Sequence, residues 1–157
     1  MAEACPDDLL ALSVALTGYD RASLWATGCV PLYLAQLADV AGPDLLARLE
    51  TAGREHAAAV GADPDAADRQ LRQRVLVDPD LGPLARSLIQ LWYLGQWTPM
   101  PPEWVQRNGS KLRDTARILS SRAYREGLVW HTIGAHPMGA KAPGFGSWAL
   151  PPAGETP

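Results

Sequence analysis

The chain has 157 residues, which suits a single domain with a sizeable core, and it is 47% hydrophobic and 20% charged. A formal net charge of −3 excludes the basic footprint of nucleic-acid-binding proteins, so no nucleic-acid partner is expected. No apolar run reaches membrane-spanning length, so no direct membrane insertion is expected.

The first ten residues, MAEACPDDLL, contain no basic segment followed by an apolar one. The chain as written therefore lacks the pattern of an export signal, and a cytoplasmic location is expected; the location would be periplasmic if such a signal had been removed. In a chain without a secretory signal, Cys5 and Cys29 are predicted to be free thiols rather than a disulfide.

Four helices are expected before residue 78, separated by capping and breaking residues. These are Asp7 and Gly18 around the first helix, Pro31 and Gly42-Pro43 around the second, Asp44 in the first turn of the third, and Asp63-Pro64 at the start of the fourth. Tyr19 to Gly28 is predicted to be a loop or short turn. The fourth helix should place Ala67, Leu71 and Val75 toward the core.

The densest apolar stretch of the sequence runs from Leu84 to Trp97, after a turn at Asp78-Pro79-Asp80. Its apolar residues recur at helical spacing, and the helix is expected to break at Gly95. A helix this apolar must be buried, either in the core of its own chain or against a partner.

The pattern after this helix is less regular. Residues 98–110, TPMPPEWVQRNGS, are predicted to be a proline-rich loop, and Lys111 to Leu119 a short helix with Leu112 inward. Ser121 is expected to cap a last helix, AYREGLVWHTIG. The predicted fold is therefore all-α, a small bundle of about five to seven helices over residues 1–133, with an irregular, extended tail over 134–157.

No catalytic, cofactor-binding or metal-binding set of residues emerges from the sequence. His56 lies on an apolar helical stripe, where a core histidine is expected. His131 and His136 have i, i+5 spacing, which places two residues on different faces of a helix. The glycines from Gly134 onward neither follow a strand nor open a helix, so no phosphate-binding loop is expected. No flavin or metal is predicted in this chain.

Three segments in a fixed order resemble a known family. They are Leu12–Tyr19 (LSVALTGY), Leu91–Gly95 (LWYLG), and Tyr124–Trp130 (YREGLVW) followed by Lys141–Ala149 (KAPGFGSWA). Together they resemble the small (gamma) subunit of bacterial FAD-dependent sugar dehydrogenases, a family that includes the subunit of membrane-bound sorbitol and glucose dehydrogenases. Residues 99–119 are an insertion relative to that family.

The resemblance implies a helical accessory subunit without catalytic residues. In the family, the small subunit wraps a large flavoprotein of the glucose-methanol-choline type, which holds the FAD and oxidises a sugar or other alcohol. A large FAD-containing subunit is thus the expected partner in a hetero-oligomer, with a cytochrome c subunit as a further candidate. Many members carry a twin-arginine export signal, which this chain as written lacks.

Seven residues are predicted to contact the partner, because aromatic side chains and methionine supply much contact area. They are Trp92, Tyr93, Trp97, Trp104, Met138, Phe145 and Trp148. The tail has too many glycines and prolines to build its own core, so its apolar side chains should be ordered on another protein.

Two other functions compete with that of a small subunit. A free-standing helical maturation chaperone would bind a redox enzyme transiently and then leave it. A small helical enzyme would have to use His131 or His136, and it would require activity of the isolated chain.

Overall fold

The computed structural model describes residues 6–137 and 140–141 and confirms the predicted all-α fold. The helices are α1 (Pro6–Thr17), α2 (Arg21–Ala26), α3 (Val30–Ala59), α4 (Pro64–Leu71), the π-helix η1 (Arg72–Leu76), α5 (Leu81–Leu94), α6 (Pro102–Asn108), α7 (Ser121–Arg125) and α8 (Leu128–Thr132). A two-stranded antiparallel ladder pairs β1 (Gln96–Trp97) with β2 (Arg117–Ile118). Most of the predicted tail lies outside the described residues.

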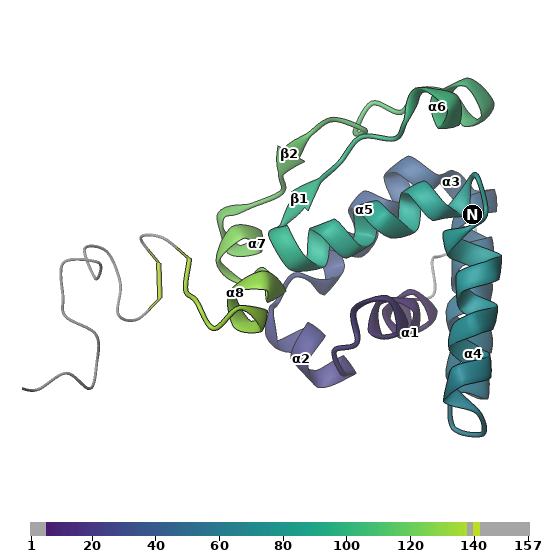
Figure 1. Ribbon diagram of the computed structural model, residues 1–157. Helices are drawn as coiled ribbons and strands as arrows, with labels where there is room; N and C mark the ends of the chain where they lie inside the picture. The colour runs from purple at the N-terminus through teal and green to yellow at the C-terminus, as the bar shows by residue number, and fades with distance from the viewer. Residues whose placement is uncertain (1–5, 138–139, 142–157) are drawn as a thin grey trace, which may run out of the picture.

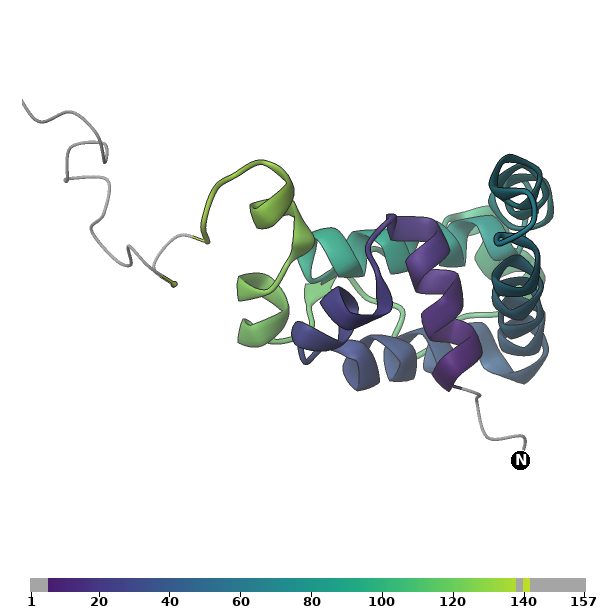
Figure 2. The ribbon, with the colours of Figure 1, turned by 90° about the horizontal axis from the view of Figure 1, so that it is seen from below.

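Helix α3 is bent into two arms at Gly42-Pro43, where the sequence predicts a break between two helices. Gly42 has φ 71° and ψ 173°, and the next residue is a proline without a backbone N–H. The first arm runs beside α5, whereas the second arm stands with α4 at one end of the molecule (Figures 1 and 2). Helices α2, α7 and α8 lie at the opposite end, and Lys141, the last described residue, follows α8 there.

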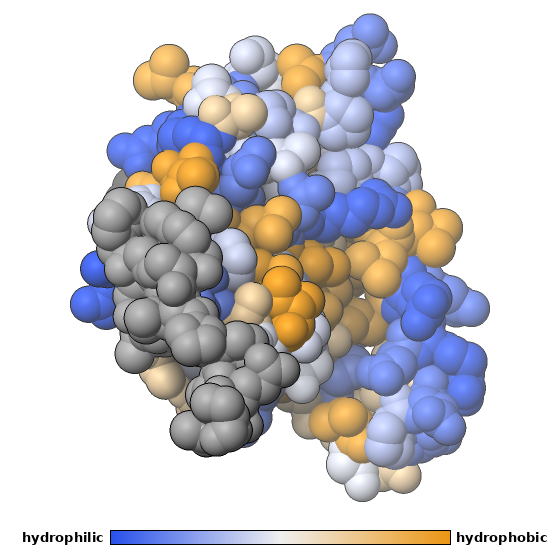
Figure 3. Space-filling view, turned by 60° about the vertical axis from the view of Figure 1, so that its left-hand side comes forward, coloured by the Kyte–Doolittle hydropathy of each residue, from blue (hydrophilic) through white to orange (hydrophobic). Residues whose placement is uncertain are grey.

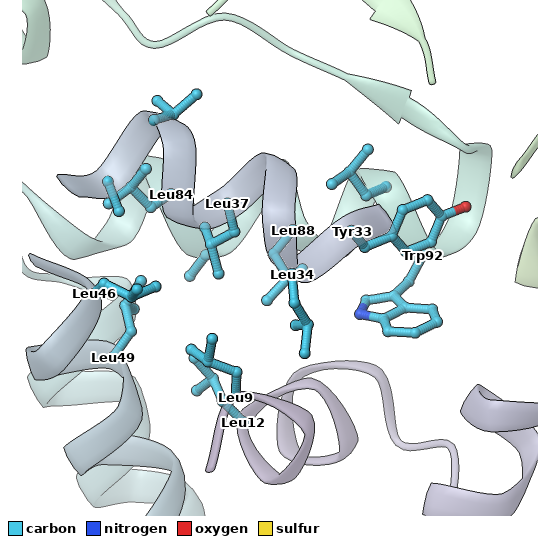
Figure 4. Packing of buried hydrophobic residues seen from close by; sticks show 14 of the residues in the cluster. Leu9, Leu12, Tyr33, Leu34, Leu37, Leu46, Leu49, Leu84, Leu88 and Trp92 are labelled. Atoms are coloured by element: carbon cyan, nitrogen blue, oxygen red, sulfur yellow. The ribbon is translucent and has the colours of Figure 1, made fainter. Parts of the chain in front are cut away.

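Helix α5 is the central element of the core, as its apolar spacing predicts. Its buried face, which includes Leu84, Leu88 and Trp92, points toward α1 and both arms of α3 (Figure 4). The helix ends at Gly95, whose left-handed conformation lets its N–H donate to the carbonyl of Leu91 at 2.8 Å. The structure thus shows that most of this stretch is buried in the chain's own core, although Leu94 near its end is 47% exposed.

The helix that follows Asp63-Pro64 is also confirmed. Asp63 caps α4 by accepting a hydrogen bond from the backbone N–H of Ala66 at 2.9 Å. The three residues predicted to face the core, Ala67, Leu71 and Val75, are buried, although Val75 lies in the π-helix that extends α4.

Two segments predicted to be loops contain helices. Asp20, within the predicted Tyr19–Gly28 loop, caps α2 by accepting from the N–H of Ser23 at 2.7 Å. This hydrogen bond, the largest cause, lowers the pKa of Asp20. In the proline-rich segment, Pro102 occupies the first turn of α6, where its missing N–H costs nothing.

The predicted helix from Lys111 to Leu119 is wrong. The carboxylate of Asp114 accepts from the indole Nε1–H of Trp97 at 2.9 Å and from the N–H of Met100 at 3.0 Å. Arg117 and Ile118 pair with β1, and Leu112, predicted to face inward, is 97% exposed. Long-range partners thus override a weak local preference for helix.

The predicted last helix is divided into α7 and α8, with a break at Glu126-Gly127, and Ser120 rather than Ser121 caps its start. Among the described residues, no helix combines the length and hydropathy required to cross a membrane. Cys29 is buried with a free thiol, whose pKa burial raises; Cys5 lies outside the described residues.

Candidate partner-binding surface

Residues 12–19, 91–95 and 124–130, the resembling segments that lie wholly within the described chain, meet at one end of the molecule. The hydroxyl of Tyr93, at the end of α5, donates to the carbonyl of Thr17, at the end of α1, at 2.9 Å. The ring of Tyr93 also packs edge-to-face against Tyr19, with centroids 6.3 Å apart. Tyr93 is therefore joined to the end of α1 by a hydrogen bond that spans 76 positions of the sequence and by the ring contact with Tyr19.

Residues 124–130 and the neighbouring Ala123 contact the end of α5 through backbone atoms. A Cβ placed on Gly95 would lie 2.4 Å from the carbonyl oxygen of Ala123, and one placed on Gly127 would lie 2.7 Å from that of Tyr93. Both glycines belong to segments of the resemblance, and both lie where only a residue without a side chain lets the end of α5 touch α7 and α8.

Aromatic side chains complete this end. Tyr19 Oη and Thr132 Oγ1 form a hydrogen bond at 2.8 Å, and the ring of His131 lies 6.3 Å from that of Tyr19. Trp130 donates through Nε1 to the carbonyl of Tyr124 at 2.8 Å and packs edge-to-face on its ring. We call the part of the molecule around Tyr19, Tyr93, Tyr124, Trp130 and His131 the aromatic end.

A pocket of about 460 Å³ opens in the aromatic end, between α2, α8 and the start of the tail. The ion pair between Lys141 and Glu126, with Nζ and Oε2 2.6 Å apart, lies in its wall. The remaining lining residues are Tyr19, Ser23, Ala26, Thr27, Gly127, Leu128, Trp130, His131, Ala135, His136 and Pro137. The tail thus begins beside this pocket.

Several apolar side chains are exposed at or near this end. They are Trp25 of α2, Leu94 of α5, Ile118 of β2 and Ile133 after α8. With this end turned toward the viewer, hydrophobic groups lie among hydrophilic ones beside the atoms drawn in grey (Figure 3). Exposed apolar side chains gathered on one part of a surface indicate a binding region.

Three of the residues predicted to contact a partner belong to the core instead. Trp92, Trp97 and Trp104 are each at most 1% exposed, so their side chains are not available to a partner. The indoles of Trp97 and Trp104 donate to Asp114 Oδ1 and to the carbonyl of Asp80, respectively. These contacts correct the prediction, because apolar helical spacing does not tell which molecule covers a side chain.

Of the other four residues predicted to contact a partner, only Tyr93 lies within the described part of the chain. Tyr93 is partly buried, and its hydroxyl is bonded within the chain, although its ring belongs to the aromatic end. Met138, Phe145 and Trp148 lie outside the described residues, so their partner contacts stay predictions. The sequence analysis does not predict the exposed Trp25 as a partner residue, because Trp25 falls in the segment predicted to be a loop. The signal that could have identified it is that tryptophan is common at interfaces.

A second hollow, of about 610 Å³, lies at the α4 end, between the second arm of α3, η1 and the turn at Asp78. Its charged side chains are paired with each other, Arg74 with Glu55 and Arg48 with Asp78, the latter pair at 2.5 Å. Partial burial alone would raise the pKa of Asp78, but hydrogen bonds from Leu81, Asp80 and Arg48 outweigh it and lower the pKa.

In the described part of the chain, no group of three His, Cys, Asp or Glu residues could hold a metal ion. His56 donates through Nε2–H to the carboxylate Oδ1 of Asp68 at 2.8 Å, and its side chain is 9% exposed, as expected for a histidine packed against the core. The aromatic end is therefore the better candidate site, because contacts, pocket, exposed apolar groups and tail meet there.

Comparisons of the chain with protein-family models, with curated proteins and with solved structures find no match.

Proposed function

We propose that the chain is a non-catalytic small subunit of an FAD-dependent oxidoreductase. Its partner would be a large flavoprotein of the glucose-methanol-choline type that oxidises a sugar, a glycoside or another alcohol. The FAD would lie in that partner, and this chain would hold no cofactor. A cytochrome c subunit is a further candidate member of the complex.

One observation carries the proposal: the three segments that resemble the family form a single contacting unit. Residues 12–19, 91–95 and 124–130 are far apart in the sequence, and chance similarities in three places would have no reason to converge. Here they share the bond from Tyr93 to Thr17 and the close approaches at Gly95 and Gly127.

The same end supplies what a subunit interface needs. Its exposed Trp25, Leu94 and Ile133 offer apolar surface. A partner that binds the folded flavoprotein stabilises it by mass action, which is how a subunit without catalytic residues would support a dehydrogenase.

Co-expression with a flavoprotein of this class encoded in the same gene neighbourhood tests the proposal. We expect the two chains to elute together in gel filtration at a fixed ratio, with flavin absorbance in that peak. The small chain alone should show no flavin absorbance. If the small chain separates from a flavin-loaded flavoprotein, a transient maturation chaperone is indicated; if neither co-elution nor improved flavoprotein yield is seen, the proposal fails.

A truncated chain tests the part played by the tail. Deleting residues 141–157 should leave the helical circular-dichroism signal intact but weaken capture of the flavoprotein more than tenfold, because Phe145 and Trp148 are predicted anchors and each anchor commonly contributes about 2 kcal/mol. Undiminished capture would place the interface on the helices alone. Loss of the helical signal would mean that the tail belongs to this chain's own core.

A further inference from the structure

The charges of the chain are unevenly distributed near the aromatic end. Residues 111–125 contain five of the fourteen cationic residues but only one of the seventeen acidic ones, Asp114. Two of these cations are bound within the chain: Arg113 pairs with Asp39 at 3.1 Å, and Arg117 donates to Gln36 Oε1 at 2.7 Å. Asp114 is occupied by Trp97 and Met100.

Arg122 and Arg125, by contrast, form no ion pair with any described residue, and both are exposed. They lie three positions apart on α7 and therefore project from the same side of the helix. The helix face opposite to them packs on α5 through the buried Ala123. α7 thus holds two guanidinium groups toward solvent without a carboxylate to neutralise them.

Arg122 brings this charge to the corner where α2 ends. A Cβ placed on Gly28 would lie 2.2 Å from Nη1 of Arg122, so the guanidinium rests directly on the backbone of Gly28. The N–H of Gly28 donates in turn to the carbonyl of Trp25 at 2.9 Å. The backbone of Trp25 therefore lies at the same corner as Arg122, and the Trp25 side chain is 49% exposed.

Leu94, at the end of α5, lies across α7 from the two arginines, because α5 packs on the opposite face of that helix. The neighbours of Leu94, Tyr93 and Gly95, touch Gly127 and Ala123, respectively, so the end of α5 runs directly along α7 at this point. The Leu94 side chain is nevertheless 47% exposed. We call Trp25, Arg122 and Arg125 the docking face; Leu94 is not part of it.

We propose that the docking face binds an acidic, partly apolar patch on the large flavoprotein. This proposal rests on the proposed function and identifies the surface that would contact the partner. Unpaired arginines call for carboxylates, and Arg and Trp are the residue types that contribute most at protein interfaces.

An anionic membrane is the less favoured occupant. Membrane recognition by charge ordinarily uses clusters of four to eight cationic residues, whereas α7 offers two free guanidinium groups and the whole chain is net negative. Two guanidinium groups near an exposed tryptophan suit a shaped protein surface better.

The test reverses the charge of the docking face in the full-length chain. Arg122→Glu/Arg125→Glu should weaken capture of the co-expressed flavoprotein by at least about tenfold at low salt and remove most of the salt dependence that the wild-type complex shows. The matched control is Arg69→Glu/Arg72→Glu: these residues are exposed, lie three positions apart at the α4 end, and produce the same change of net charge. The control should bind like the wild type.

The outcomes separate this inference from the proposed function. If wild-type chain captures the flavoprotein and both double variants bind equally, the docking face is not the interface while the small-subunit function stands. If the wild type itself fails to capture, the proposed function fails and the docking face falls with it. If reversal instead abolishes binding to phosphatidylglycerol vesicles and spares capture, the face is a membrane contact and the proposal is overturned. If the charge-reversal variant loses its helical signal, Arg122→Gln/Arg125→Gln takes its place. This variant should show a smaller loss of capture, and unchanged capture would refute the docking face.

Discussion

At the α4 end, ion pairs connect neighbouring elements, whereas at the aromatic end the elements are connected by ring contacts and close backbone approaches. Arg48 and Arg74 join the second arm of α3 to the residues around η1, and Arg107 of α6 joins Asp80 at 2.8 Å. All of these pairs are partly exposed, and such pairs typically contribute about 0–1 kcal/mol each. The α4 end should therefore tolerate loss of a single charge.

The aromatic end has little of that tolerance, because its contacts depend on steric fit. Helices α7 and α8 have five residues each, and they are held where Gly95 and Gly127 let one backbone touch another. The difference teaches that the end proposed to bind a partner is the end whose shape is fixed by packing. Added atoms should disturb it more than removed charges.

The largest effect is expected where both ends share one core. Trp92→Ala should destabilise the chain by about 3–5 kcal/mol, because Trp92 is 1% exposed and packs edge-to-face on Tyr33 at 4.9 Å. Urea unfolding of this variant beside Trp25→Ala, whose indole is half exposed, measures it. An unchanged midpoint for Trp92→Ala would show that α5 is not the centre of the core.

Trp92→Phe refines that result. The indole N–H of Trp92 has no hydrogen-bond partner among the described residues, so phenylalanine removes a buried, unsatisfied donor while it keeps an aromatic ring. We expect Trp92→Phe to recover most of the stability lost in Trp92→Ala. Equal losses in the two variants would mean that the size of the indole, not burial of an aromatic ring, decides stability here.

Gly95→Ala tests the fit at the aromatic end. A left-handed conformation alone costs a residue with a Cβ about 1–2 kcal/mol, and at Gly95 the Cβ would also meet Ala123 at 2.4 Å. The matched control is Gly18→Ala. Gly18 ends α1 at φ +75° with its N–H donating to the carbonyl of Val14 and with nothing within 4 Å of an added Cβ, so this variant carries only the conformational cost. Equal destabilisation of the two variants would refute the close contact between α5 and α7.

A smaller loss is expected from the single hydrogen bond at this end. Tyr93→Phe removes the bond to the carbonyl of Thr17 and should cost about 1 kcal/mol by chemical denaturation. Tyr124→Phe is the control, since the hydroxyl of Tyr124 forms no hydrogen bond with the described residues. A loss no greater than that of the control would show that the rings alone hold α1 to α5.

The smallest effect belongs to the α4 end and depends on pH. The pKa of Asp78 is lowered in the folded chain, so its contribution is present above the ordinary carboxyl pKa of about 3.9 and is lost as the pH falls through the lowered value. Asp78→Asn should therefore be slightly less stable than the wild type at pH 7 and show a shallower decline in stability below about pH 4. Parallel acid profiles for the two proteins would contradict this assignment.

Local signals in the sequence predict much of this fold. Asp63-Pro64, Gly42-Pro43 and Gly95 mark boundaries correctly because capping, proline geometry and a left-handed glycine act within a few residues. The segment from Lys111 to Leu119 was mispredicted because Asp114 and Arg117 take partners as distant as Trp97 and Gln36, which a local pattern does not contain.

The candidate site was harder to predict for the same reason. An apolar stripe with several tryptophans shows that surface will be covered, but not whether the cover is the same chain, and the structure gives Trp97 and Trp104 intramolecular partners. The free charge of Arg122 could not be predicted either, since it depends on which arginines of the 111–125 segment find acceptors elsewhere in the fold.

The shortness of α7 and α8 has a consequence for the order of folding. Isolated helices of five residues do not form in water, because nucleation costs more than so few hydrogen bonds return. Both helices also leave the ribosome after α1, α3 and α5, the elements on which they rest. We therefore expect the docking face to be assembled last, so that a flavoprotein recognising it would select only chains whose folding is complete.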